Sequence, residues 1–149
     1  MLEGIDPLLT GEVLLHLDRM GHGDAVVVAD AHFPAWALGE RVVDLPGTTT
    51  PEVVAAIRSV LPLDDAPGMD LMESADASVL DVQHELIAAA GTMLDTTRFV
   101  ERFAYYDVAR GAYLMVRTGE TRTYGNALLR KGVVGHPAVG SRTPERRPS

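Results

Sequence analysis

Two histidines and two aspartates lie close together in the chain, on either side of a short apolar run. Gly21-His22-Gly23-Asp24 precedes the run of residues 25–29, and Asp30-Ala31-His32 follows it. An imidazole exchanges protons near neutral pH, and a nearby carboxylate can orient it. The glycines beside His22 allow a ligand to approach the main chain closely. These residue types are suited to moving protons on a small substrate, although a histidine in a glycine-rich turn is also typical of an ordinary polar surface.

The same four side chains also suggest a metal site, but their spacing argues against one. As a strand, the run between Asp24 and Asp30 would span about 16 Å, which is too far for all four to bind one ion. The chain contains no cysteine, so disulfides, thiolate catalysis and Cys-ligated metals are excluded. We therefore expect no metal.

Two further segments carry side chains that suit a sugar or another polyhydroxylated ligand. Arg102-Phe-Ala-Tyr-Tyr106 offers a planar fork of donors next to phenols, and tyrosines are common in sugar sites. In Tyr124-Gly125-Asn126, the amide can both donate and accept, and the phenol can transfer a proton. The alternatives are a helix start that buries Phe103 and one tyrosine, and an ordinary turn into a strand.

Composition and missing motifs narrow the class of function. The chain has 149 residues, 46% hydrophobic and 23% charged, with a net charge of −8. The acidity makes nucleic acid an unexpected partner and favours a neutral small molecule. No membrane-length apolar run and no signal-peptide pattern occur, so we expect a cytoplasmic protein without membrane contact. The dinucleotide, Walker and nucleophile-elbow motifs are absent as well.

Short apolar runs alternate with segments of helical periodicity. Thr10 is expected to cap a first helix that ends at Gly21, Thr50 to cap a second, and Asp76 or Ser78 to cap a third. The predicted helices cover residues 11–20, from 50 to before Pro62, from 76–78 to 91, and 103–110. The predicted strands cover residues 25–29, 41–45, 69–72, 113–117 and 126–130.

This alternation predicts a single α/β domain with helices on both sides of a mostly parallel, mixed sheet. In such sheets, ligands bind beyond the carboxyl ends of the strands, which directs attention to Asp30. The domain is expected to span residues 1–134. Prolines and charges after Gly135 favour a disordered tail over residues 135–149.

Several of these segments, in this order, resemble the L-fucose mutarotase branch of the ribose pyranase and fucose mutarotase family. The similarity covers roughly residues 1–134 and is weaker over about 63–98. The matching segments are Leu2–Leu9, Met20–Asp24, Ala29–Pro34, Arg102–Tyr106, Thr118–Glu120 and Tyr124–Val133.

The resemblance implies a three-layer α/β/α, ribose-pyranase-like fold and ring-shaped homo-oligomers, often decamers, with sites near subunit contacts. It implies His22 as the catalytic acid or base, with Tyr124 as a possible partner in proton transfer. It also implies that Asp30, Arg102 and the segment Tyr124-Gly125-Asn126 bind the sugar.

The implied reaction is the interconversion of anomers, and of pyranose and furanose forms, of a free monosaccharide such as L-fucose. One acid and one base on a positioned sugar can open and reclose the ring, so no cofactor is expected. A D-ribose pyranase, and a non-catalytic sugar-binding or regulatory protein of the same fold, remain as alternatives.

Overall fold

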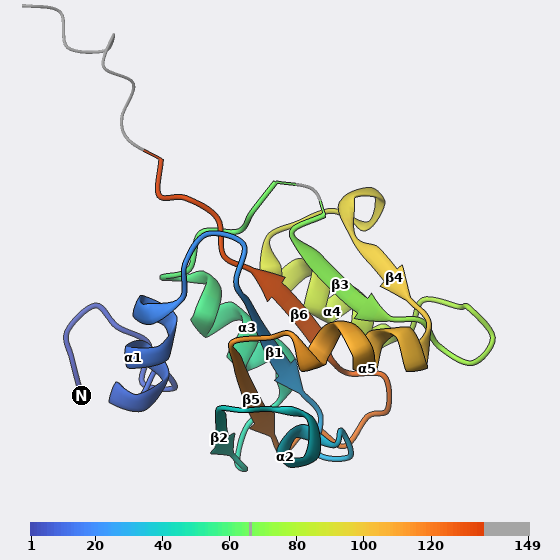
Figure 1. The fold of residues 1–149 in the computed structure, drawn as a ribbon, viewed down its shortest axis with the longest axis horizontal. Coiled ribbons are helices and arrows are strands. Elements are labelled where there is room, and N and C mark those ends of the chain that lie inside the picture. The colour runs from blue at the N-terminus through green and yellow to red at the C-terminus, as the bar shows by residue number, and fades with distance from the viewer. Residues whose placement is uncertain (66, 136–149) are drawn as a thin grey trace, which may run out of the picture.

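A computed structural model describes residues 1–65 and 67–135, and within them the chain forms one six-stranded mixed sheet (Figure 1). The strand order is β2-β5-β1-β6-β3-β4. β6 is antiparallel to β1 and β3, and the other neighbouring pairs are parallel. The strands are β1 Ala25–Ala29, β2 Val42–Leu45, β3 Met69–Met72, β4 Arg98–Val100, β5 Leu114–Thr118 and β6 Ala127–Arg130.

Helices cover both faces of this sheet, because its central strands are apolar on both sides. Val26 and Val28 of β1 belong to a core with α1, α3 and α4, whereas Val27 and Ala29 belong to a core with α2 and α5. The three-layer α/β/α architecture expected from the sequence is therefore confirmed. The helices are α1 Gly11–Arg19, α2 Ala35–Leu38, α3 Thr50–Arg58, α4 Asp81–Ala90 and α5 Arg102–Arg110, with a 3₁₀ turn η1 over Leu94–Thr96.

The helix starts correct two of the predicted caps. Thr10 caps α1 as predicted, but α3 is capped by Thr49, whose hydroxyl accepts from Glu52 N while the Glu52 carboxylate accepts from Thr49 N. Thr50 is instead the first residue of α3, and it is buried. α4 begins after Leu80, because Asp76 uses its carboxylate within the preceding loop, where it accepts from Ser74 and Ser78.

The end of α1 also differs from the prediction. Met20 follows the helix with extended backbone angles, and the left-handed glycine is Gly23 rather than Gly21. α2 and β4 were not predicted, because the four residues of α2 make little more than one helical turn and the three residues of β4 give too short a strand to show an alternation. The tail predicted to be disordered lies outside the described residues from 136 onward. Among the described residues, no helix is long and apolar enough to cross a membrane.

Candidate functional site

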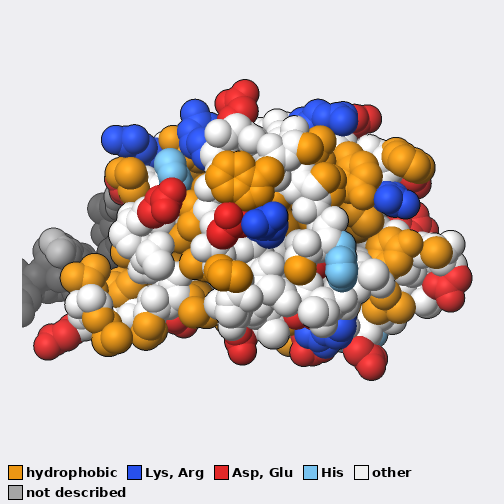
Figure 2. Space-filling view, turned by 90° about the horizontal axis from the view of Figure 1, so that it is seen from below, with side chains coloured by type: hydrophobic (Ala, Val, Ile, Leu, Met, Phe, Trp, Pro, Cys, Tyr) orange, Lys and Arg blue, Asp and Glu red, His pale blue; other side chains and the backbone are white. Residues whose placement is uncertain are grey.

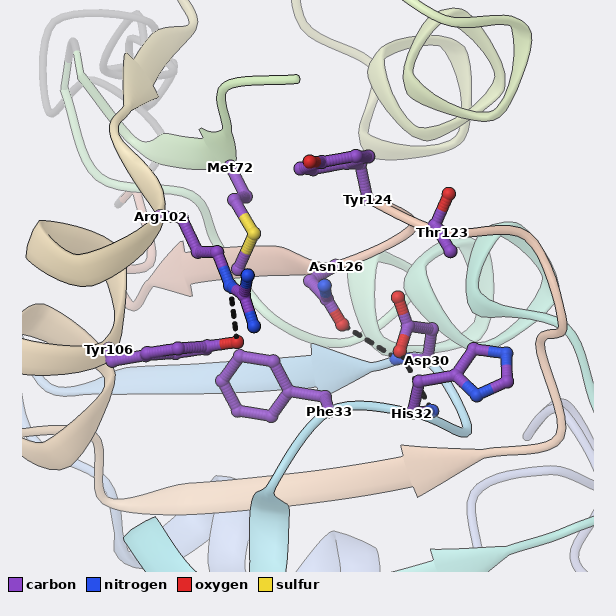
Figure 3. A pocket seen from close by; sticks show the side chains of 9 residues that line it. All are labelled: Asp30, His32, Phe33, Met72, Arg102, Tyr106, Thr123, Tyr124 and Asn126. Atoms are coloured by element: carbon purple, nitrogen blue, oxygen red, sulfur yellow. Dashed lines mark hydrogen bonds between the residues drawn. The ribbon is translucent and has the colours of Figure 1, made fainter. Parts of the chain in front are cut away.

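The candidate site is a cavity of about 260 Å³ at the edge of the sheet where β1, β3 and β5 end (Figure 3). Because β6 runs the opposite way, its first residues start at this same edge. Separate parts of the sequence therefore meet here. The lining residues are Asp30, His32, Phe33, Met72, Arg102, Tyr106, Thr123, Tyr124 and Asn126.

Asp30 follows β1 directly and is held from both sides. Its backbone N–H donates to Asn126 Oδ1 at 2.7 Å, and its carboxylate accepts from the backbone N–H of His32 at 3.0 Å. The residue is only 3% exposed. Burial raises the pKa of the Asp30 carboxyl above its ordinary value, although hydrogen bonds from the backbone of His32, Phe33 and Gly125 oppose that effect.

Asn126 is buried, and its bond to Asp30 decides which end of its amide is free. The amide oxygen accepts from the main chain, so the NH₂ group is the end left for a ligand (Figure 3). Asp30 and Asn126 thus present an acceptor and a donor side by side, which is the pairing that a sugar hydroxyl needs.

Arg102 and Tyr106 lie in the first turn and a half of α5, and both line the cavity. Arg102 Nε donates to Tyr106 Oη at 3.1 Å, and this bond raises the pKa of the Arg102 guanidinium. The terminal guanidinium nitrogens and the phenolic proton of Tyr106 are then available to a ligand. Tyr106 also packs edge-on against Phe33, with ring centroids 5.5 Å apart.

Tyr105, the other tyrosine of segment 102–106, is fully buried in the core, as the alternative interpretation of this segment as a helix start predicted. That interpretation also predicted a buried Phe103, which is wrong, because Phe103 is 67% exposed. Glu101 caps α5 with its carboxylate, and this start turns Phe103 outward.

Tyr124 lines the cavity from the β5–β6 loop with a left-handed backbone, φ 60°. This conformation is unfavourable for a bulky residue. Gly125 follows it and does not line the cavity, but a Cβ there would lie 3.0 Å from Arg122 O and 3.2 Å from Glu120 Cγ. A larger residue at position 125 would therefore need its neighbours Arg122 and Glu120 to shift by a few tenths of an ångström.

His22 is not part of this cavity. It precedes β1, at the opposite edge of the sheet, where its Nε2 lies 3.1 Å from Asp64 Oδ1 and its side chain is 62% exposed. The hydrogen bond with His22 lowers the pKa of Asp64. Asp24 lies at the same edge and accepts from Gly21 N at 2.7 Å.

His22 and Asp24 therefore lie at one end of β1, and Asp30 and His32 at the other. Within residues 1–65 and 67–135, no cluster of three or more His, Asp or Glu side chains is arranged to hold a metal ion.

Three pocket residues were not singled out from the sequence: Phe33, Met72 and Thr123. Phe33 and Thr123 lie beside residues that were singled out, whereas Tyr106 belongs to the segment that was proposed for its arginine and tyrosines. Met72 ends a buried strand, and nothing in its local sequence separates it from the core.

Comparison with known proteins assigns the family. Residues 3–134 match the model of the RbsD / FucU transport protein family. The chain belongs to this family. A fucose mutarotase from Danio rerio is 38% identical over 146 residues, which cover 90% of this chain and 95% of that protein.

Solved structures extend the likeness of this RbsD/FucU chain to three dimensions. The crystal structure of protein Atu2016 is 38% identical with a TM-score of 0.84, and covers 91% of this chain and 97% of its own. A fucose mutarotase from Streptococcus pneumoniae in complex with L-fucose is 30% identical with a TM-score of 0.81 and covers 90% and 100%.

Proposed function

We propose that this protein is an isomerase that interconverts the anomers of a free monosaccharide, and that its substrate is L-fucose. The observation that carries the proposal is the cavity at the sheet edge, which is lined by the polar side chains of Asp30, Asn126 and Arg102 and by the apolar side chains of Phe33 and Met72. Relatives over nearly the whole chain are named fucose mutarotase, and one of them was solved with L-fucose.

For this reaction, a protein needs only to position the sugar and to transfer protons to and from it. Opening the hemiacetal removes the proton of the anomeric hydroxyl and protonates the ring oxygen. The bond between the ring oxygen and the anomeric carbon breaks, and the anomeric carbon becomes the carbonyl carbon of the open chain. Reclosure on the other face of the carbonyl gives the other anomer. One acid and one base held near the ring accomplish this.

The free hydrogen-bonding groups of the cavity suggest how the sugar is held. The Asp30 carboxylate accepts from a sugar hydroxyl, the Asn126 NH₂ group donates to one, and the Arg102 guanidinium nitrogens donate to others. Tyr124, which also lines the cavity, carries a phenol that can exchange a proton with the sugar.

The apolar part of the cavity favours a 6-deoxy sugar. Phe33 and Met72, which are 5% and 4% exposed, are the apolar side chains of the cavity, and Figure 3 shows the Arg102 guanidinium between them. A methyl substituent fits against these two side chains, whose own atoms offer a hydroxymethyl group no hydrogen-bond partner.

His22 requires a second copy of the chain if it is the catalytic acid or base. Five residues of β1 separate its turn from Asp30, a distance of about 16 Å along the strand, so it cannot act on a sugar in the cavity of its own chain. We infer that a neighbouring copy in a homo-oligomeric ring supplies His22 to the cavity. Exposed apolar side chains such as Trp36 and Phe103 support an assembly.

Saturation-exchange NMR on the anomeric protons of L-fucose tests the proposal. We expect protein-dependent exchange that is lost in His22→Ala and unchanged in His84→Ala, a histidine exposed on α4. D-Arabinose, which is L-fucose without the methyl carbon, and L-galactose, which adds a hydroxyl to it, should exchange more slowly. D-Ribose exchange alone would indicate a pyranase, and a fully active His22→Ala protein would remove His22 from the mechanism.

A further inference from the structure

The β5–β6 loop, which carries Thr123, Tyr124 and Asn126, is anchored from below by a buried carboxylate. Glu120 is only 2% exposed, and its Oε1 accepts from Arg122 Nε at 2.5 Å. The same guanidinium reaches the carboxylate of Glu85 on α4 through both of its terminal nitrogens. Glu85, Arg122 and Glu120, hereafter the Arg122 clamp, thus tie the loop to a helix on the far face of the sheet.

The clamp is continuous with the backbone on both sides of Asp30. Glu120 O accepts from Ala31 N at 2.8 Å, and Glu120 N donates to Thr118 Oγ1 at 3.1 Å. Thr118 in turn donates to Ala29 O at 2.8 Å. These bonds use the main chain of Glu120 and the hydroxyl of Thr118, so they hold the residues on either side of Asp30 without the Arg122 side chain.

The clamp is also close in sequence to the strained tyrosine. Tyr124 has its left-handed backbone two residues after Arg122, and such a conformation persists only where its surroundings enforce it. Gly125 is packed between Arg122 O, Glu120 Cγ and Val82 Cγ2, at 3.0 to 3.2 Å from a would-be Cβ. Asn126, by contrast, is held independently by Asp30 N and by the start of β6.

We propose that the Arg122 clamp is a positioning device that holds Tyr124 in its left-handed conformation over the sugar. Arg122 and Glu120 do not line the cavity, so they act on the reaction only through the loop. Releasing the clamp lets Tyr124 relax, whereas the Asp30–Asn126 pair keeps its place. Substrate binding is then largely preserved and the proton-transfer step is lost.

Arg122→Met and Arg122→Lys test the device, with Arg110→Met as the matched control, because Arg110 makes an exposed pair with Asp107 on α5. Glu85→Gln provides a milder release at an exposed position. We expect Arg122→Met to lower kcat for fucose exchange at least tenfold while KM changes less than threefold. Arg122→Lys, which keeps the charge but loses the fork, should recover part of kcat, and the control should match the wild type.

Hydrogen exchange of segment 119–126, followed by mass spectrometry, provides a readout that does not depend on the proposed function. Faster exchange there in Arg122→Met, but not in Arg110→Met, is the expected result. Unchanged hydrogen exchange in segment 119–126 would overturn the positioning role, as would a change in KM as large as the change in kcat.

A wild-type protein that does not interconvert the anomers of any sugar would refute the proposed function. The hydrogen-exchange result would still decide whether the clamp holds the loop.

Discussion

Tyr105 and Tyr106 are neighbours on α5 that have opposite roles. Tyr106 Oη accepts from Arg102 in the cavity, whereas the structure gives the buried Tyr105 hydroxyl no hydrogen-bond partner among the described residues. Burial raises the pKa of Tyr105 well above its ordinary value, so the phenol stays neutral. The pair provides an internally matched experiment on the same helix.

Tyr106→Phe is expected to raise KM for L-fucose about three- to tenfold, which corresponds to about 1 kcal/mol, because Arg102 loses the acceptor that orients it. Tyr105→Phe removes an unpaired buried hydroxyl, so its unfolding free energy should equal that of the wild type or exceed it by about 1 kcal/mol. Exchange kinetics and urea unfolding measure the two effects. A larger kinetic loss in Tyr105→Phe than in Tyr106→Phe would contradict this assignment.

The raised pKa of Asp30 gives a pH dependence with a definite sign. In the proposed mode of binding, the ionised carboxylate of Asp30 accepts from a sugar hydroxyl, so sugar affinity should weaken as the pH falls through the Asp30 pKa. Because burial places that pKa above the ordinary 3.8, the decline should begin at a higher pH than it would for an exposed aspartate. Titration calorimetry with L-fucose measures it. Asp30→Asn should bind L-fucose weakly, and its affinity should not fall further at low pH. An affinity that falls at low pH in this variant as it does in the wild type would assign the pH dependence to another group.

At the scale of elements, one carboxylate joins three strands. Asp70 of β3 is fully buried and accepts two hydrogen bonds each from Arg98 of β4 and Arg130 of β6. Burial alone would raise the pKa of Asp70, but the bonds and charges of the two arginines outweigh it and lower the pKa. This network holds β3, and Met72 at the end of β3 lines the candidate cavity.

Asp70→Asn should lower the unfolding free energy by about 3 kcal/mol at neutral pH, since it leaves two guanidinium groups facing a neutral amide. The Asp70 pKa is lower in the folded protein than in the unfolded chain. Its contribution is therefore complete above about pH 4 and is lost as the pH falls through the folded value. Urea unfolding as a function of pH measures the difference between the proteins. A difference that persists unchanged at pH 2 would show that the charge is not its source.

The elements that sequence could predict are those with enough length to show a pattern. β1, β3 and the four longer helices emerged from periodicity and caps, whereas β4 is stabilised by pairing with β3 and by the Asp70–Arg98 bond, both distant in sequence. The site divides in the same way. Asp30, Arg102, Tyr124 and Asn126 lie in recognisable segments, but Met72 reaches the cavity only because β3 ends at that edge of the sheet.

At the scale of the whole molecule, the two edges of the sheet hold different parts of the proposed chemistry. Asp30 and its partners lie at one edge and His22 at the other. On the face seen in Figure 2, apolar side chains are exposed among charged ones. Among the exposed large apolar side chains of the described residues are Trp36 of α2, which is 60% exposed, and Phe103 of α5, which is 67% exposed. A second copy that packs against exposed apolar side chains such as these would bury them and could supply its own His22 to the cavity.

Mixing two inactive variants tests this arrangement. His22→Ala keeps an intact cavity, and Asp30→Ala keeps an intact histidine, so a site formed between one chain of each kind contains both groups. If neighbouring copies share the site, each variant alone should be inactive, and reassembly of an equimolar mixture should restore about a quarter of the sites, since each neighbour is drawn at random from two kinds. Anomeric exchange of L-fucose, measured before and after reversible dissociation, provides the readout.

A mixture of Asp30→Ala with Arg102→Ala is the control, because both changes lie within one cavity. This mixture should recover no activity, since every site then contains at least one of the two substitutions. Recovery in that control, or none with His22→Ala, would contradict a cavity completed by the histidine of a neighbour.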